Sequence, residues 1–246
     1  NEPGYSTFDF SQQLYRSFDF ADSIVIFDKF EAEKWVNDIV QLKHGLYLIS
    51  EAFEDKYRFK VVDFKDRSVI AEYDILNILK CVVSDAEIKS IAYDKNLIFE
   101  GYFSSGSGDF IVYTCNKAGI FILFNKNGKF VKEFHTIDQL PIPKFGTREI
   151  SPGYLVHEVT PDLRGNYSRG INENNVFILS NILEPSYNDQ RPMDVYDLKD
   201  GKYLYSFFVP NLEDGQTPNE IFVYDDNLYV LYDNSEIIKF KLNVLE

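Results

Sequence analysis

The sequence is poor in the residues that build metal centres and disulfide frameworks. Its 246 residues include two cysteines and three histidines. Cys81 and Cys115 have neither a CxxC arrangement nor another spacing typical of a metal site, and they predict either two buried free thiols or one disulfide. His44, His135 and His157 lie in separate segments without the spacing of metal ligands. We therefore expect no bound metal and no cofactor.

Long apolar runs and basic charge are scarce as well. No stretch approaches the roughly 18 apolar residues of a membrane-spanning helix, so we expect no insertion of this chain into a membrane. Lysine and arginine total 25 against 39 acidic residues, which leaves a net charge of −14. Nucleic acid is excluded as a partner, because phosphate binding requires a basic surface. The opening, NEPGYSTFDF, has neither a Met nor a signal-peptide pattern, as expected of a mature or trimmed chain.

Aromatic residues, in contrast, are abundant. The chain has 22 Phe and 17 Tyr, and 45% of its residues are hydrophobic. A disordered chain would be much poorer in such residues, and Phe, Tyr, Val and Ile favour pleated, half-buried surfaces. A chain of this length can bury a large core without disulfides or metals. The composition therefore predicts a single all-β domain over residues 1–246.

Residues 110–134, FIVYTCNKAGIFILFNKNGKFVKEF, are the most informative segment. Apolar runs at 110–115, 120–124 and 129–134 predict three short strands. The Asn127-Gly128 pair between two of these runs is a strong hairpin signal, and it predicts a type I′ turn with positive φ at both central residues. The segment thus predicts a small antiparallel sheet.

Weaker copies of this pattern recur along the chain. One hairpin shape is shared by residues 39–50, 90–101 and 221–232, and a second shape, with a polar turn followed by Gly, Lys and an aromatic residue, is shared by 121–134 and 194–207. Four units are visible, near residues 36–73, 88–134, 154–209 and 219–246. Repeated four-stranded units of about 40–50 residues are typical of propeller blades, so we predict a β-propeller of four-stranded antiparallel blades. A β-sandwich with long loops is the alternative.

Some segments have other interpretations. Residues 70–92 and 28–37 are compatible with short helices as well as with connections between blades. Residues 5–10 or 23–27 are expected to close the ring by completing the last blade. The visible spacing of the units is wide and favours five blades.

Residues 120–129, IFILFNKNGK, resemble the blade pattern I-x-V-F-D-x-x-G-K of NHL repeats, with Asn125 where that pattern has Asp. The chain as a whole, over residues 36–242, resembles the TolB-like six-bladed propellers found among bacterial envelope lipoproteins. The resemblance implies six blades. It also implies export to the periplasm or outer surface, with lipid anchoring through a segment that this chain lacks. These motifs specify architecture and not activity, because binding and catalytic propellers share them.

Candidate ligand-binding residues gather in residues 144–192, which we interpret as long loops between strands, where binding residues are often found. The candidates are Arg148, His157, Arg164, Tyr167, Arg169, Tyr187 and Arg191. An arginine cluster in an acidic protein predicts a site where guanidinium groups bind a carboxylate or phosphate through paired hydrogen bonds. The alternative is that these arginines pair with surface acids. No catalytic residue is predicted, because no GxSxG motif is present and residues 104–108, SSGSG, are followed by neither a lysine nor a helix that a phosphate-binding loop requires.

Three functions follow from this interpretation. The first is a non-enzymatic binding module that contacts a sugar, peptide or protein through loops on one face. The second is a hydrolase of glycosidase or lactonase type on the same scaffold. The third is a purely structural domain.

Overall fold

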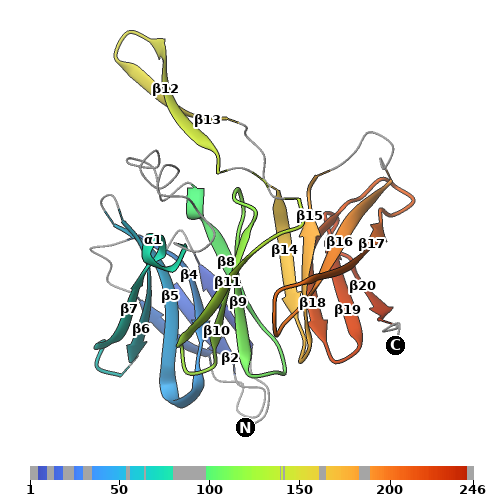
Figure 1. Cartoon of the computed structure of the whole chain (residues 1–246), viewed down its shortest axis with the longest axis horizontal. Coiled ribbons are helices and arrows are strands. Elements are labelled where there is room, and N and C mark those ends of the chain that lie inside the picture. Colours follow the sequence, from blue (N-terminus) through green and yellow to red (C-terminus); the bar gives the residue numbers. More distant parts are fainter. Residues whose placement is uncertain are drawn as a thin grey trace.

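The structure is a computed structural model that describes residues 5–9, 14–18, 25–29, 35–53, 56–63, 65–79, 98–138, 140, 142–160, 165–182 and 189–242. It is a β-propeller built from antiparallel sheets (Figure 1). Among the described residues, no helix is both long enough and apolar enough to cross a membrane. The fold prediction from the sequence is therefore confirmed at the level of architecture, while the number of blades stays a prediction.

Three of the described sheets have four strands each. The first contains β4 (Trp35–Gln41), β5 (Leu46–Phe53), β6 (Lys56–Asp63) and β7 (Val69–Asp74). The second contains β8 (Gly101–Ser105), β9 (Phe110–Cys115), β10 (Ile120–Asn125) and β11 (Phe130–His135). The third contains β14 (Asn166–Ile171), β15 (Asn175–Ser180), β16 (Gln190–Asp197) and β17 (Tyr203–Pro210).

Two further sheets have three strands, and one has two. They are β1 (Tyr5–Asp9), β2 (Leu14–Phe18) and β3 (Val25–Lys29); β18 (Pro218–Tyr224), β19 (Asn227–Tyr232) and β20 (Ile237–Lys241); and the hairpin of β12 (Lys144–Ser151) and β13 (Tyr154–Thr160). The short helices are η1 (Lys43–Gly45) and α1 (Ile75–Ile78). The hairpin projects from one end of the propeller (Figure 1).

Successive sheets pack face to face. One core cluster joins Leu48 and Phe59 of the β4–β7 sheet to Tyr113 of β9. A second joins the opposite face of the β8–β11 sheet to the β14–β17 sheet, and a third joins the β14–β17 sheet to the β18–β20 sheet. Because both faces of an inner sheet are buried, β9 and β10 are continuous apolar runs instead of alternating ones. This radial packing rules out the sandwich alternative.

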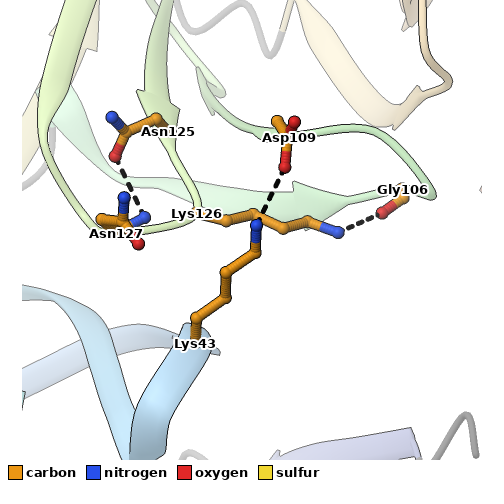
Figure 2. Close-up of polar contacts among 6 residues, drawn as sticks. All are labelled: Lys43, Gly106, Asp109, Asn125, Lys126 and Asn127. Carbon is orange, nitrogen blue, oxygen red and sulfur yellow. Dashed lines mark hydrogen bonds and ion pairs between the residues drawn. The ribbon is translucent and has the colours of Figure 1, made fainter. Parts of the chain in front are cut away.

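The turn at Asn127-Gly128 differs from the predicted type I′ turn. Gly128 has φ +77°, but Asn127 is not among the residues with positive φ. The Asn125 side chain accepts a hydrogen bond from the N–H group of Asn127 at 3.0 Å (Figure 2). It also accepts one from the N–H of Lys129 at 3.0 Å, and the ladder shifts register between Leu123 and Phe124. The type I′ prediction was therefore wrong: the loop is longer, and Asn125 stabilises it with Gly128 as the one left-handed glycine.

The same turn recurs between β16 and β17, which explains the repeat seen in the sequence. Gly201 has φ +69°, and Asp197 takes the place of Asn125 by accepting from the N–H of Lys199 at 2.8 Å. Each glycine lies against the preceding sheet. A Cβ atom on Gly128 would collide with Val61 and Leu42, and one on Gly201 would collide with the ring of Phe134. The glycines therefore serve both the turn and the packing between blades.

Polar contacts tie the neighbouring turns together (Figure 2). The Lys43 ammonium lies 3.0 Å from the Asp109 carboxylate, and the Lys126 ammonium donates to the Gly106 carbonyl oxygen at 2.8 Å. The segment between β8 and β9, residues 106–109, is thus fixed to the turns on either side. It lies at the end of the propeller opposite the β12–β13 hairpin (Figure 1).

A buried ion pair lies on the face of the β4–β7 sheet that does not pack against β8–β11. Lys60 of β6 pairs with Glu51 of β5, and the two side chains are 6% and 4% exposed. Lys60 also lies 3.8 Å from Glu72, which itself pairs with Arg58 at 2.8 Å. These four groups form a charged network across three strands.

Several local predictions were wrong. Residues 97–102 were expected to be a strand, but Ile98 and Phe99 are helical and buried, and β8 begins at Gly101. A Cβ on Gly101 would collide with the Thr114 carbonyl, so glycine allows the close approach of β8 to β9. Residues 144–192 are mostly strands and not long loops. The N-terminal strands form their own sheet and do not complete the last blade.

The helix expectations had mixed outcomes. Within residues 70–92, α1 is a helix of four residues that follows β7, and its N-cap Asp74 accepts from the N–H of Leu76 at 2.9 Å. The rest of that segment, 80–92, lies outside the described residues. Residues 28–37 contain the end of β3 and the start of β4, so the helical alternative does not hold for the described part of this segment.

Candidate functional site

The innermost strands β4, β8 and β14 meet at a polar clamp. Asp38 of β4 accepts a hydrogen bond from the backbone N–H of Phe103 at 2.6 Å. Arg169 of β14 donates to the backbone carbonyl of the same residue at 2.9 Å. The Arg169 guanidinium also lies 4.7 Å from the centre of the Tyr102 ring, a distance typical of a cation–π contact. One residue of β8 is thus held from both sides by neighbouring blades.

The clamp residues affect each other's protonation. Burial raises the pKa of Asp38 to about 6, although the charge of Arg169 and hydrogen bonds from the backbone N–H groups of Phe103 and Ile39 act in the opposite direction. Burial also lowers the pKa of Arg169, and the charges of Asp38 and Glu220 oppose that shift. The charges of Asp38 and Glu220 thus offset part of the cost of burying Arg169, which suits a structural role.

We expect Asp38→Asn to change how the stability depends on pH. Because the folded-state pKa of Asp38 is raised above its ordinary value, its contribution to stability is fully present below about pH 4 and is lost as the pH rises through 6. The free energy of unfolding of the wild type, relative to the variant, should fall by up to about 3 kcal/mol between pH 4 and pH 7. Urea unfolding at four pH values measures this difference, and a difference that is independent of pH would contradict it.

Arg191 of β16 has a different environment. Its guanidinium donates to the side-chain oxygen of Asn181 at 2.6 Å and to the hydroxyl of Thr217 at 3.4 Å. It lies 4.5 Å from the centre of the Tyr167 ring. Thr217 in turn donates to Asp233 at 2.6 Å. Within the described part of the chain, no carboxylate forms an ion pair with Arg191, and its buried Nε–H has no acceptor.

A β-bulge presents Tyr167 to this arginine. In the β14–β15 ladder Asn166 pairs with Ser180 and Ser168 with Leu179, so Tyr167 is the extra residue. Bulges change the direction in which a side chain points and often lie beside binding sites. Arg191 pairs with Val209 near the start of β16, and Thr217 immediately precedes β18. The group, which we call the Arg191 cluster, is thus built by two adjacent blades.

The structure brings together some of the predicted site residues and not others. Tyr167, Arg169 and Arg191 lie on β14 and β16. Arg148 lies on the projecting hairpin and is exposed, and His157 lies on β13 opposite Thr147. Arg164 and Tyr187 lie outside the described residues. Only some of the predicted ligand-binding residues therefore belong to one site.

Sequence reasoning missed the residues that hold these arginines. Asp38 could have been suspected, because it is an acid within the apolar strand WVNDIVQ. Asn181 and Thr217 carry no comparable signal, since polar residues next to strands are common.

The remaining candidates for chemistry are structural in the described part of the chain. Cys115 is a free thiol in the core, and burial raises its pKa well above the ordinary value. Its predicted alternative partner, Cys81, lies outside the described residues. His44 adopts a left-handed conformation in η1, with φ 63°. No group of three or more metal-binding side chains occurs among the described residues.

Comparison with known proteins supports the fold. No protein-family model matches the chain, and no curated protein gives a significant match. A protein of unknown function from Bacteroides caccae has a similar structure, with TM-score 0.51 and 10% identity over 98% of this chain and 69% of that one. A catalytically inactive virginiamycin B lyase from Staphylococcus aureus, solved with quinupristin, has TM-score 0.50 and 10% identity over 98% of this chain and 78% of that one. At such identities the likeness shows the β-propeller fold alone.

Proposed function

We propose that this chain is a non-enzymatic binding propeller that holds an anionic group at the Arg191 cluster. The ligand is a sugar, peptide or protein that carries a carboxylate or a phosphate. The observation that carries the proposal is the contrast between the two arginines: the charges of Asp38 and Glu220 offset part of the cost of burying Arg169, whereas neutral oxygens and an aromatic ring hold Arg191. In a chain with net charge −14, a guanidinium that forms no ion pair with any described carboxylate suggests a binding function.

The geometry of the Arg191 cluster favours an oxyanion. A guanidinium presents five N–H donors in a plane, and two parallel donors match the two oxygens of a carboxylate or phosphate. Stacking on Tyr167 fixes the plane of the guanidinium before a ligand arrives, which reduces the entropy lost on binding.

We expect Arg191→Gln to weaken oxyanion binding by about tenfold or more, because it removes a charge-assisted hydrogen bond. Isothermal titration calorimetry with inorganic phosphate, D-glucuronate and uncharged D-glucose measures the effect. Arg191→Lys keeps the positive charge but loses the two parallel N–H donors, so this variant should bind the anions with intermediate affinity. The matched control is Arg148→Gln, on the exposed hairpin, which should bind as the wild type does. Equal binding by Arg191→Gln, or no binding of either anion by the wild type, would contradict the proposal.

We further propose that the chain belongs with the TolB-like and NHL-like propellers and works at the bacterial envelope, in the periplasm or on the outer surface. The support is the blade pattern of residues 120–129, in which Asn125 occupies the position of the usual Asp and stabilises the turn as described above. Fractionation of the native host with an antibody against the chain tests the location. Recovery from the cytoplasmic fraction would contradict it.

We assign no catalytic role to Asp38, although its raised pKa is of the kind that general acids have. Its carboxylate already accepts hydrogen bonds from the backbone N–H groups of Phe103 and Ile39. These bonds hold the inner strands together. The hydrolase alternative therefore has no specific observation in its favour.

A further inference from the structure

The β18–β20 sheet has one strand fewer than the three four-stranded sheets. Its order is β18-β19-β20, and β20 pairs with β19 on one side only among the described strands. A strand at a sheet edge presents unpaired backbone N–H and C=O groups that can pair with another chain. Among the described residues, no strand pairs with the outer edge of β20.

The fourth strand has a packing role in the other sheets. Phe130 at the start of β11 packs against the core shared with the preceding β4–β7 sheet. Tyr203 at the start of β17 packs against the core shared with the preceding β8–β11 sheet. Both residues follow the Gly-Lys pair of the repeated turn. The β18–β20 sheet has no described residue in this role.

A groove lies at the corresponding position. It is a cavity of about 410 Å³ between β17 and β20, and its apolar lining includes Phe177, Tyr205, Phe207, Leu228, Phe240 and Leu242. Tyr205, Phe207 and Phe240 are only half-buried, so the two sheets cover each other incompletely here. We call this cavity, with the edge of β20, the β20 groove.

The charged residues of β20 indicate which kind of strand would pair with its outer edge. Lys239 and Lys241 lie at alternate positions of β20, on one face of the strand, and both are exposed; Lys241 also lines the groove. Lys239 lies over the Tyr229 ring at 5.7 Å, and Lys241 pairs with Asp226 at 3.5 Å, where both side chains are more than 60% exposed. Opposite charges on adjacent strands attract each other, and like charges directly opposite repel. A strand beside β20 should therefore carry acidic residues on that face.

We propose that the β20 groove binds an extended segment of a partner protein as the fourth strand of this sheet. Apolar residues at alternate positions of the segment enter the groove, and the acidic residues between them face Lys239 and Lys241. Recognition by strand addition combines backbone hydrogen bonds, which give affinity, with side-chain pockets, which give specificity. A second copy of this chain fits less well, because antiparallel pairing of two β20 strands places lysines opposite lysines.

A short capped peptide that alternates glutamate with valine or phenylalanine tests the proposal. We expect it to bind the intact chain in fluorescence anisotropy and to slow amide hydrogen exchange in β20. The double variant Lys239→Glu/Lys241→Glu should weaken this binding about tenfold and strengthen binding of the same peptide with lysine in place of glutamate. The matched control, Lys199→Glu/Lys202→Glu in the β16–β17 turn, should leave both affinities unchanged.

Two outcomes would overturn the proposal. One is equal affinity of the wild type for the glutamate and lysine peptides, or no affinity for either. The other is a dimer in sedimentation equilibrium that the Lys239→Glu/Lys241→Glu variant alters, which would assign the edge to a second copy. Val209, which pairs with Arg191, also lines the groove, so anion binding is tested separately with the Arg191→Gln variant.

Discussion

Gly128→Ala and Gly201→Ala should each destabilise the protein by about 3 kcal/mol, as measured by urea unfolding monitored by circular dichroism. Each glycine has a positive φ, which costs a residue with a Cβ about 1–2 kcal/mol. The added methyl group would also collide with the preceding sheet, at Val61 and Leu42 or at Phe134, and overpacking of this kind costs about 1–3 kcal/mol. The two sites lie in different turns and share no contact, so the double variant should lose the sum of the two.

Gly215→Ala separates the two contributions. Gly215 has φ +82°, and a Cβ there would meet no atom within 4 Å. Its replacement should therefore cost only the backbone term, about 1 kcal/mol. If all three variants lost the same free energy of unfolding, Gly128 and Gly201 would contribute through their turns alone. A role of these two glycines in the packing between blades would then be contradicted.

The second large effect is expected at the buried ion pair. Lys60→Met removes the charge that balances Glu51, whose side chain is 4% exposed. Breaking a buried pair by removing one partner costs about 3–5 kcal/mol, because the remaining charge is left buried. The double variant Glu51→Leu/Lys60→Met removes both charges and should recover most of this loss. Thermal and urea unfolding measure the set.

The control for this series is Lys241→Met, which removes an ion pair with Asp226 that is mostly exposed. Exposed pairs contribute about 0–1 kcal/mol, so we expect little change. A double variant as unstable as Lys60→Met would show that the loss comes from altered packing and not from the uncompensated carboxylate.

The fold could be predicted from the sequence where the signal is local. The apolar runs of β9 and β10 and the polar turn after Asn125 are visible in the sequence, and the structure confirms the strands. The turn type was predicted wrongly, because the Asn127-Gly128 pair suggested a short type I′ hairpin. The hydrogen bonds accepted by Asn125, which favour the longer loop, depend on a side-chain conformation that a sequence pattern does not contain.

The site was harder to predict because its parts come from different blades. Tyr167 lies on β14 and Arg191 on β16, with β15 between them, and Thr217 lies in the next blade. The sequence showed a concentration of arginines but not which arginine would meet an acid. That difference, on which our functional proposal rests, is decided by electrostatic interactions such as the one between Arg169 and Asp38, whose partners lie far apart in the chain.

The most direct test of the binding proposal is the position of an oxyanion in crystals of the protein. Crystals soaked in selenate would locate the anion by the anomalous scattering of selenium. We predict a peak within hydrogen-bonding distance of the Arg191 guanidinium, with none at Arg169, whose charge Asp38 balances. Peaks at other sites and none at Arg191, in crystals where no neighbouring molecule covers this arginine, would contradict the account.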